Sequence, residues 1–279
     1  MSSTPPSPSL TQPPSPPKST PPTHILPNTI SKTYALLHPL LLLTLLTTRF
    51  NALVTNPTTE LLTTLPPLAL LQLTFAITCL PPTGTKEKDD EEKPKQKPSP
   101  RRKPPKPDST WFAAKIITKP QTNNTSSRPK PAILSLTLTT LLAIPVLTIL
   151  LVLFGAPLTT HHPQTLLCAA HMAVLTATAL VYVHGVDGGV WREVWGASRP
   201  ADAVWGGALG SCVGAWFGAV PIPLDWDRPW QAFPITIVVG AYIGYAVGVG
   251  LGRTVLFGKR LKIEDEGEGD LGGGERRVD

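Results

Sequence analysis

Six apolar runs of about twenty residues recur along this chain, and a run of that length crosses the hydrocarbon layer of a bilayer as a helix. We predict transmembrane helices at residues 34–54, 61–80, 132–154, 164–184, 202–221 and 232–254. The third run carries no charged residue, whereas the first ends near Arg49, whose long side chain can reach the membrane surface. The expected fold class is therefore all-α: a polytopic membrane bundle of about six transmembrane helices.

Two polar, proline-rich stretches lie outside the apolar runs. Of the 33 prolines in the chain, 10 fall within residues 1–33 and 11 within residues 81–131. Such segments bury too little apolar surface to offset the chain entropy lost on folding, so we expect both to be disordered. The predicted plan is a disordered tail, helices one and two, a disordered loop, helices three to six and a C-terminal tail, at 1–33, 34–80, 81–131, 132–257 and 258–279.

The basic residues predict an orientation in the membrane. Six spans place both termini and the long loop on one side, which then holds 23 of the 25 Lys and Arg residues; only Arg49 and Arg228 lie opposite. Without the 13 basic residues of the long loop, the bias is still 10 to 2. The positive-inside rule makes the tails and the long loop cytosolic. Because orientation accounts for the net charge of +6, we expect no nucleic-acid partner.

Glycine recurs at every fourth residue in the last two apolar runs. The fifth run carries Gly206, Gly210, Gly214 and Gly218, and the sixth carries Gly240, Gly244, Gly248 and Gly252. At 3.6 residues per turn this spacing forms a stripe without side chains, and in lipid such stripes allow close contact between helix backbones. Two interpretations stay open: the two helices pack on each other, which a short connection favours, or one stripe docks a helix of another protein.

The connection between the two glycine-bearing helices is short and stiff. Its backbone is restricted by four prolines, Pro221, Pro223, Pro229 and Pro234. Trp216, Trp226 and Trp230 suit a membrane interface, at which one edge of the indole is apolar and the other is wet.

The connecting segment Pro221-Ile-Pro-Leu-Asp-Trp-Asp-Arg-Pro-Trp-Gln231 resembles the signature of the PIG-F family of glycosylphosphatidylinositol (GPI) anchor biosynthesis proteins. Phe154-Gly-Ala-Pro-Leu158, at the end of the third run, is also similar to that family. The likeness covers residues 132–257 and, through the six-helix plan, extends to the rest. Residues 1–33 and 81–131 depart from the compact family members, and their role stays open.

The resemblance implies a multi-pass protein of the endoplasmic reticulum membrane, in which the positive-inside rule makes both termini cytosolic. It implies a non-catalytic subunit that binds and stabilises the large ethanolamine-phosphate transferases, which act on mannose residues of the GPI precursor in the lumen. Expected partners are these transferases and membrane lipids. Which transferase is bound, and through which helices, the resemblance does not specify. The residues that we expect to carry the family signature, or to contact the partner, are Gly214, Trp216, Gly218, Pro221, Pro223, Asp225, Trp226, Asp227, Arg228, Pro229, Trp230, Gly240, Gly244 and Gly248.

The predicted lumenal loops offer little material for catalysis. Phosphoethanolamine transfer usually needs a hydroxyl nucleophile and two metal ions held by several Asp and His residues. The candidates are His161 and His162, which point opposite ways on an extended segment, and Asp225 and Asp227, which can instead pair with Arg228 and hold a rigid loop. Because each loop has only around ten residues, we expect no catalytic residue, no metal site and no cofactor.

A lipid transporter, scramblase or lipid-handling enzyme is the alternative from another class. Prolines at positions 66, 67 and 145 within the predicted helices favour it, but we detect no inverted repeat and almost no charge at mid-membrane depth. His171 lies inside the fourth helix, where we expect it to hydrogen-bond to another helix. Cys79, Cys168 and Cys212 all fall in apolar runs, and we expect buried, inert thiols.

Overall fold

The computed structural model describes residues 20–83, 129–224 and 226–260, and every regular element within these ranges is helical. The elements are α1 (Thr29–Thr55), α2 (Pro57–Cys79), α3 (Pro129–Leu138), the π-helical turn η2 (Thr139–Ala143), α4 (Ile144–Leu153), α5 (His162–His184), α6 (Gly188–Trp195), α7 (Ala203–Ala219), the 3-10 turn η3 (Pro229–Gln231) and α8 (Ile235–Arg253). The predicted all-α class is confirmed.

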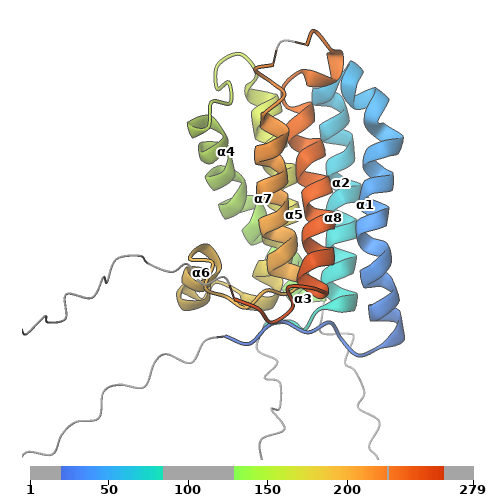
Figure 1. The fold of residues 1–279 in the computed structure, drawn as a ribbon, viewed down its shortest axis with the longest axis vertical. Helices are drawn as coiled ribbons and strands as arrows, with labels where there is room; N and C mark the ends of the chain where they lie inside the picture. The colour runs from blue at the N-terminus through green and yellow to red at the C-terminus, as the bar shows by residue number, and fades with distance from the viewer. Residues whose placement is uncertain (1–19, 84–128, 225, 261–279) are drawn as a thin grey trace, which may run out of the picture.

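Each of the six apolar runs forms a helix. Five helices in the described residues are long and apolar enough to cross a membrane, and the third of these is the continuous helix formed by α3, η2 and α4. The remaining run forms α7, which has 17 residues and lies beside α8 through the bundle (Figure 1). At 1.5 Å per residue α7 is about 25 Å long, slightly less than the hydrocarbon thickness.

The predicted disorder of residues 1–33 and 81–131 falls mostly outside the described residues. Within the described part, residues 20–28 form an extended segment and α1 begins at Thr29, five residues before the predicted start. The C-terminal tail is described only as far as residue 260.

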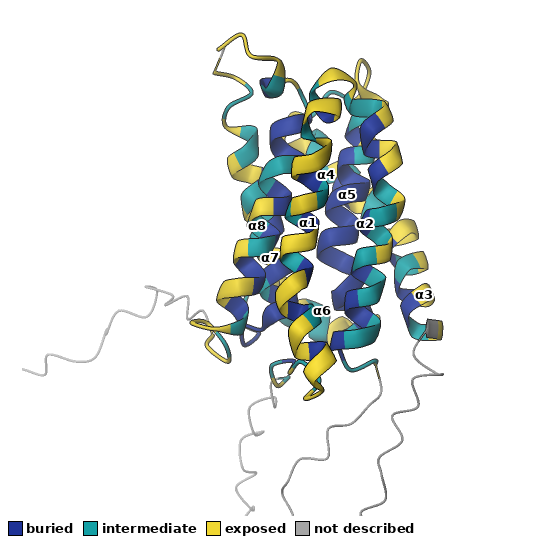
Figure 2. Cartoon of the chain, turned by 90° about the vertical axis from the view of Figure 1, so that its right-hand side faces the viewer, coloured by how far each residue is buried: buried dark blue, intermediate teal, exposed yellow. Residues whose placement is uncertain are grey.

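Helix α5 forms the centre of the bundle. It packs against α2, α4, α7 and α8, and 16 of its 23 residues are buried. The outward faces of the surrounding helices expose large apolar side chains, such as Leu70 of α2 and Leu153 of α4 (Figure 2). This inside-and-outside distribution suits a bundle surrounded by lipid, in which exposed leucine needs no cover.

His171 of α5 joins three helices through its imidazole. The Nε2 atom lies 2.9 Å from the carbonyl oxygen of Leu61 in α2, and Nδ1 lies 3.0 Å from the hydroxyl of Tyr242 in α8. Because a carbonyl oxygen only accepts, Nε2–H donates to Leu61, and Nδ1 of the neutral ring accepts from Tyr242. The predicted hydrogen bonding of His171 to other helices is confirmed.

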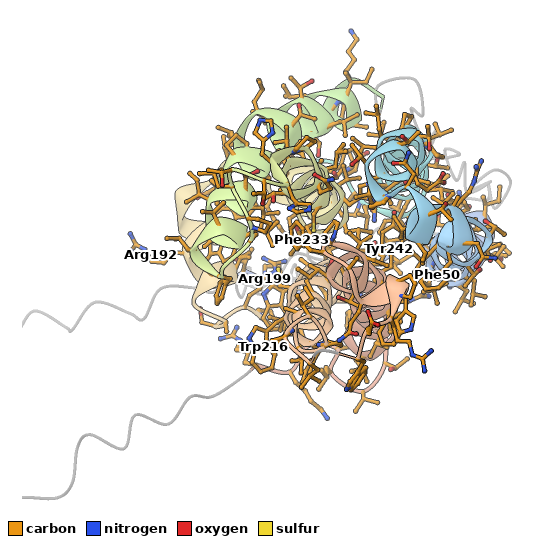
Figure 3. The ribbon with its side chains drawn as sticks, turned by 90° about the horizontal axis from the view of Figure 1, so that it is seen from above. Phe50, Arg192, Arg199, Trp216, Phe233 and Tyr242 are labelled. Carbon is orange, nitrogen blue, oxygen red and sulfur yellow. The ribbon has the colours of Figure 1, made fainter. Side chains whose placement is uncertain are left out.

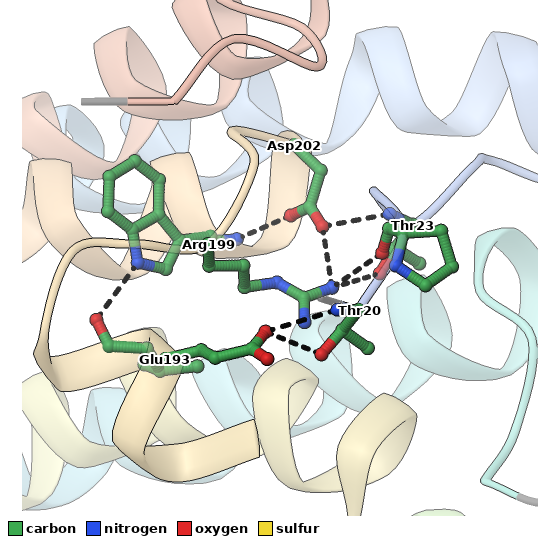
Figure 4. Close-up of polar contacts among 8 residues, drawn as sticks. Thr20, Thr23, Glu193, Arg199 and Asp202 are labelled. Carbon is green, nitrogen blue, oxygen red and sulfur yellow. Dashed lines mark hydrogen bonds and ion pairs between the residues drawn. The ribbon is translucent and has the colours of Figure 1, made fainter. Parts of the chain in front are cut away.

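The base of the bundle, at the end where α6 lies, is tied together by a buried ion pair. Arg199 and Asp202, in the connection between α6 and α7, approach to 3.2 Å with both side chains fully buried. The Arg199 guanidinium also donates to Thr23 Oγ1 at 3.1 Å (Figure 4). Asp202 accepts from the backbone N–H of Thr23 at 2.9 Å and from that of Trp205, in the first turn of α7, at 2.8 Å.

The contacts of Thr23 and two further hydrogen bonds hold the extended N-terminal segment in place. Thr20 donates to the Glu193 carboxylate of α6 at 2.5 Å, and the N–H of Leu26 donates to the carbonyl of Cys79 at the end of α2 at 2.9 Å. We call residues 20–28 the strap. It connects α1 to α6, to α7 and to the end of α2 across one end of the bundle.

Replacing Arg199 by Met should lower stability strongly, because it leaves the Asp202 carboxylate buried without its cation. Removing one member of a buried ion pair costs about 3–5 kcal/mol. The thermal unfolding midpoint of the full chain in detergent measures the loss. The matched control is Arg192→Met, since Arg192 is exposed on α6 and should change stability by no more than about 0.5 kcal/mol. Equal midpoints for the two variants would contradict a stabilising role of the ion pair.

Candidate interaction surface

The two glycine stripes face each other in antiparallel register. Gly206, Gly210 and Gly214 of α7 lie against Gly248, Gly244 and Gly240 of α8, with backbone directly on backbone. A methyl group added at Gly210 would stand 2.8 Å from the Gly248 Cα, closer than real side chains come. The end rungs meet other backbone atoms: Gly218 lies against the carbonyl of Thr236, and Gly252 against that of Asp202.

This arrangement shows the first interpretation, packing of α7 on α8, while docking of a partner helix stays a prediction. Packing of α7 on α8 is the observed use, and it occupies all eight glycines. The glycines expected to contact a partner are therefore engaged inside the chain. A partner would have to contact the outer side of the helix pair.

In the described residues, the connection between α7 and α8 is closed by a side-chain amide. The Gln231 side chain donates to the carbonyls of Pro221 and of Leu224, the second at 2.9 Å, and so ties η3 to the turn that follows α7. No ion pair joins Asp227 to Arg228 in the described part of the loop, and Asp225 lies outside the described residues. Gln231 is the loop-closing residue that charge-based reasoning missed.

Of the two loop tryptophans at this end of the bundle, Trp226 is exposed and Trp230 is half-buried. Trp226 and Trp230 meet edge to face at a centroid distance of 6.0 Å. Trp216 lies on the outer side of α7 (Figure 3). Asp227 and Arg228 are also exposed, and Asp227 takes a positive φ of 50°. Pro223 lies in the turn after α7, and Pro229 begins η3.

An apolar groove runs along the outer side of the α7–α8 pair. We call it the outer groove; its volume is about 670 Å³. The glycine stripes form its floor, and its walls repeat every four residues: Leu209, Val213 and Phe217 on α7, and Val239, Ile243, Val247 and Leu251 on α8. Pro221, Trp230 and Phe50 of α1 line one end. The groove therefore joins the signature loop to the glycine pair in one surface.

The histidines and cysteines considered in the sequence analysis do not assemble into a catalytic site. His161 is exposed and its Nδ1 lies 2.9 Å from Thr160 Oγ1. In the part of the chain that the structure describes, no three His, Cys, Asp or Glu side chains come close enough to hold a metal ion. Cys79 and Cys168 are buried, Cys212 is half-buried, and all three are free thiols.

An ion pair at the α1–α2 connection also lay beyond the sequence analysis. Arg49 and Glu60 approach to 3.7 Å, with Glu60 largely buried and Arg49 exposed. The sequence offered one signal for it, since Arg49 and Glu60 flank the short link between two apolar runs. Helix α6 also escaped prediction, although Trp191, Val194 and Trp195 show the spacing of one helix face.

Comparison with known proteins identifies relatives over most of the chain. The GPI biosynthesis protein family Pig-F matches residues 37–253. The chain is 53% identical to glycosylphosphatidylinositol anchor biosynthesis protein 11 of Aspergillus fumigatus, over 91% of this chain and 90% of that protein. It is 46% identical to the protein of the same name from Neurospora crassa, over 76% of this chain and 71% of the relative.

A human relative carries a more specific name. The chain is 33% identical to the human GPI ethanolamine phosphate transferase, stabilizing subunit, over 41% of this chain and 54% of that protein. No solved structure matches the chain.

A methyl group on the glycine contact should destabilise the helix pair, whereas the same change outside the contact should not. Gly244→Ala places its Cβ 2.9 Å from the Gly214 Cα, and relieving such overpacking costs about 1–3 kcal/mol. Gly250→Ala is the control on the same helix, because nothing lies within 4 Å of its added Cβ. Thermal unfolding in detergent should show a lower midpoint for Gly244→Ala only. Unchanged midpoints for both would contradict the backbone contact.

Proposed function

This chain belongs to the GPI biosynthesis protein family Pig-F, and on that basis we propose that it binds and stabilises the ethanolamine-phosphate transferases that modify mannose residues of the GPI precursor. It acts as a non-catalytic subunit. The names of the human and mouse relatives, each a stabilizing subunit of GPI ethanolamine phosphate transferase, support this assignment.

The outer groove is the surface on which we expect the transferase to dock. Its lining on α8 runs from Ile235 to Gly252, a rise of about 26 Å, which is most of the hydrocarbon thickness of about 30 Å. One occupant that fills such a length is a transmembrane helix, since a lipid acyl chain reaches only to mid-membrane. Walls with a four-residue repeat present ridges into which the side chains of a third helix can pack.

A helix in this groove would gain stability by close packing. In lipid, apolar side chains gain little from leaving the bilayer, so association depends on dispersion between well-fitted surfaces. Because the floor consists of glycines, a docking helix can come close to the backbones of α7 and α8. This is the observation that carries the proposal.

The signature residues lie where they could meet the part of a partner outside the bilayer. Trp216, Trp226, Asp227 and Arg228 are exposed near the loop end of the outer groove, and Trp230 is half-buried there. The tryptophans provide large, rigid contact area, and the charged pair provides polar contacts around it. We expect this end to face the lumen of the endoplasmic reticulum, with both termini cytosolic, since the basic residues concentrate on the opposite side.

Co-purification tests the proposal. The full chain, tagged and extracted in mild detergent, should recover a much larger membrane protein with a metal-dependent transferase domain, identified by mass spectrometry. Ethanolamine-phosphate transfer, or lipid movement in vesicles, by the purified chain alone would overturn the assignment.

A bulky residue in the groove should weaken that association. In Val213→Trp the added ring occupies the space of the docking helix, and overpacking of about 1–3 kcal/mol lowers the affinity for the transferase roughly 5- to 150-fold, with a matching loss of recovery. Leu70→Trp is the matched control, because Leu70 is exposed on α2 away from the groove. Equal recovery with both variants, at equal expression, would exclude the outer groove as the docking surface while leaving the subunit assignment intact.

A further inference from the structure

A second apolar groove opens beside α7, next to the outer groove, and Trp205 and Leu209 line both grooves. We call it the side groove; it has a volume of about 460 Å³ and lies between α4 and α7, with α5 as its floor. Helix α4 packs on α5 and leans away from α7, as Figure 1 shows. The π-helical turn η2, which directly precedes α4 and Pro145, changes the course of this helix.

Helix α6 lies at one end of the side groove. Trp191, Val194 and Trp195 share one face of α6 and line the groove. The indole N–H of Trp191 donates to the Gly185 carbonyl at 2.9 Å, and that of Trp205 donates to the Val194 carbonyl at 3.3 Å, so α6 is fixed to the ends of α5 and α7.

The other face of α6 is polar. Arg192 points away from the bundle (Figure 3), and Glu193 binds the strap on the side away from the groove. A short helix with a tryptophan-rich apolar face and a charged face is typical of segments that lie flat at the headgroup level of a membrane. Helix α6 therefore marks the level of one membrane surface.

The side groove extends from that surface into only one leaflet. Its lining runs from Leu138 to Leu147 on the α3–α4 helix and from Trp205 to Cys212 on α7, rises of about 14 Å and 11 Å. Half of the hydrocarbon thickness is about 15 Å. A transmembrane helix would continue past the mid-membrane end of this lining, whereas the acyl chain of one lipid ends near that level.

The chemistry of the lining suits an aliphatic chain. Leucine, valine, alanine and tryptophan side chains dominate it. The one hydroxyl in the lining, that of Thr176, is already used, because it donates to the Met172 carbonyl at 2.8 Å. The groove thus offers no free hydroxyl for a headgroup, and the exposed cation nearest its mouth along the chain is Arg192 on α6.

We propose that the side groove binds one acyl chain of a glycerophospholipid from the leaflet in which α6 lies, with the lipid phosphate at the level of Arg192. Trp195, 68% exposed at the mouth, lies where the acyl chain meets the headgroup. This site adjoins the outer groove at Trp205 and Leu209, but the proposal does not depend on binding of the transferase.

Photolabelling in a bilayer tests the site. The full chain is placed in nanodiscs of phosphatidylcholine that contain a trace of phosphatidylcholine with a diazirine at the middle of one acyl chain. After irradiation, mass spectrometry should find adducts at Leu142, Ala177 and Cys212 at least fivefold above those at Leu70, which is 65% exposed to lipid on α2. Equal labelling of Leu70 and the groove residues would overturn the proposal.

Two variants make the test specific. Ala177→Phe fills the floor of the groove and should reduce the groove adducts to the level at Leu70; Trp195→Ala, at an exposed position that does not endanger folding, should reduce them severalfold. Leu70→Phe is the size-matched control and should leave them unchanged. Groove adducts that persist in Trp195→Ala, or groove crosslinks to a second polypeptide in place of lipid, would contradict an acyl-chain site.

The headgroup part of the proposal has its own measurement. Native mass spectrometry of the detergent-purified chain should show one retained phospholipid, and Arg192→Gln should reduce that retained fraction severalfold. If Arg192→Gln left the retained fraction of phospholipid unchanged, the proposed contact between the lipid phosphate and Arg192 would be contradicted.

Discussion

Backbone contact between α7 and α8 is the constraint on which the rest of the structure depends. Because eight glycines remove the side chains from the seam, the two helices approach until carbonyls and Cα atoms touch. This close approach brings the two helix axes together. On the outer side of the pair the glycines then form the floor of a groove, and the neighbouring apolar side chains form its two walls. The surface available to a partner is thus a by-product of how the chain packs on itself.

The two grooves beside α7 differ in how far they extend across the membrane, and this extent indicates which kind of molecule can fill each groove. One follows the helix pair through most of the membrane, whereas the other stops near its middle under α6. Since both linings are apolar, composition alone would not separate them. A bundle of this size can therefore present one side to a protein helix and another to a single lipid.

Much of this fold follows from apolar run length and from glycine spacing. The runs predicted all the long helices, and the four-residue repeats predicted a close helix contact. What escaped prediction depends on tertiary position: the Gln231 bonds, the buried pair of Arg199 and Asp202, and the π-helical turn before Pro145. A glutamine or an arginine in a short polar segment is normally solvated, and only the assembled bundle makes these two side chains structural. Tryptophans in a short loop indicate a membrane interface from the sequence alone, but they do not identify a partner.

The strap imposes a sequence of events on synthesis of the chain. Thr23 must wait for Asp202, which is made 179 residues later, before its N–H finds a partner. At a translation rate of about 5–20 residues per second, that interval is roughly 10 to 35 s. During this time α1 and α2 are already made and Leu26 can bond to Cys79, but Thr20 and Thr23 of the strap still lack their partners on α6 and α7. The strap can therefore form its bonds to Glu193 and Asp202 only after α6 and the start of α7 have been synthesised. In a chain that stops earlier, Thr20 and Thr23 lack these partners.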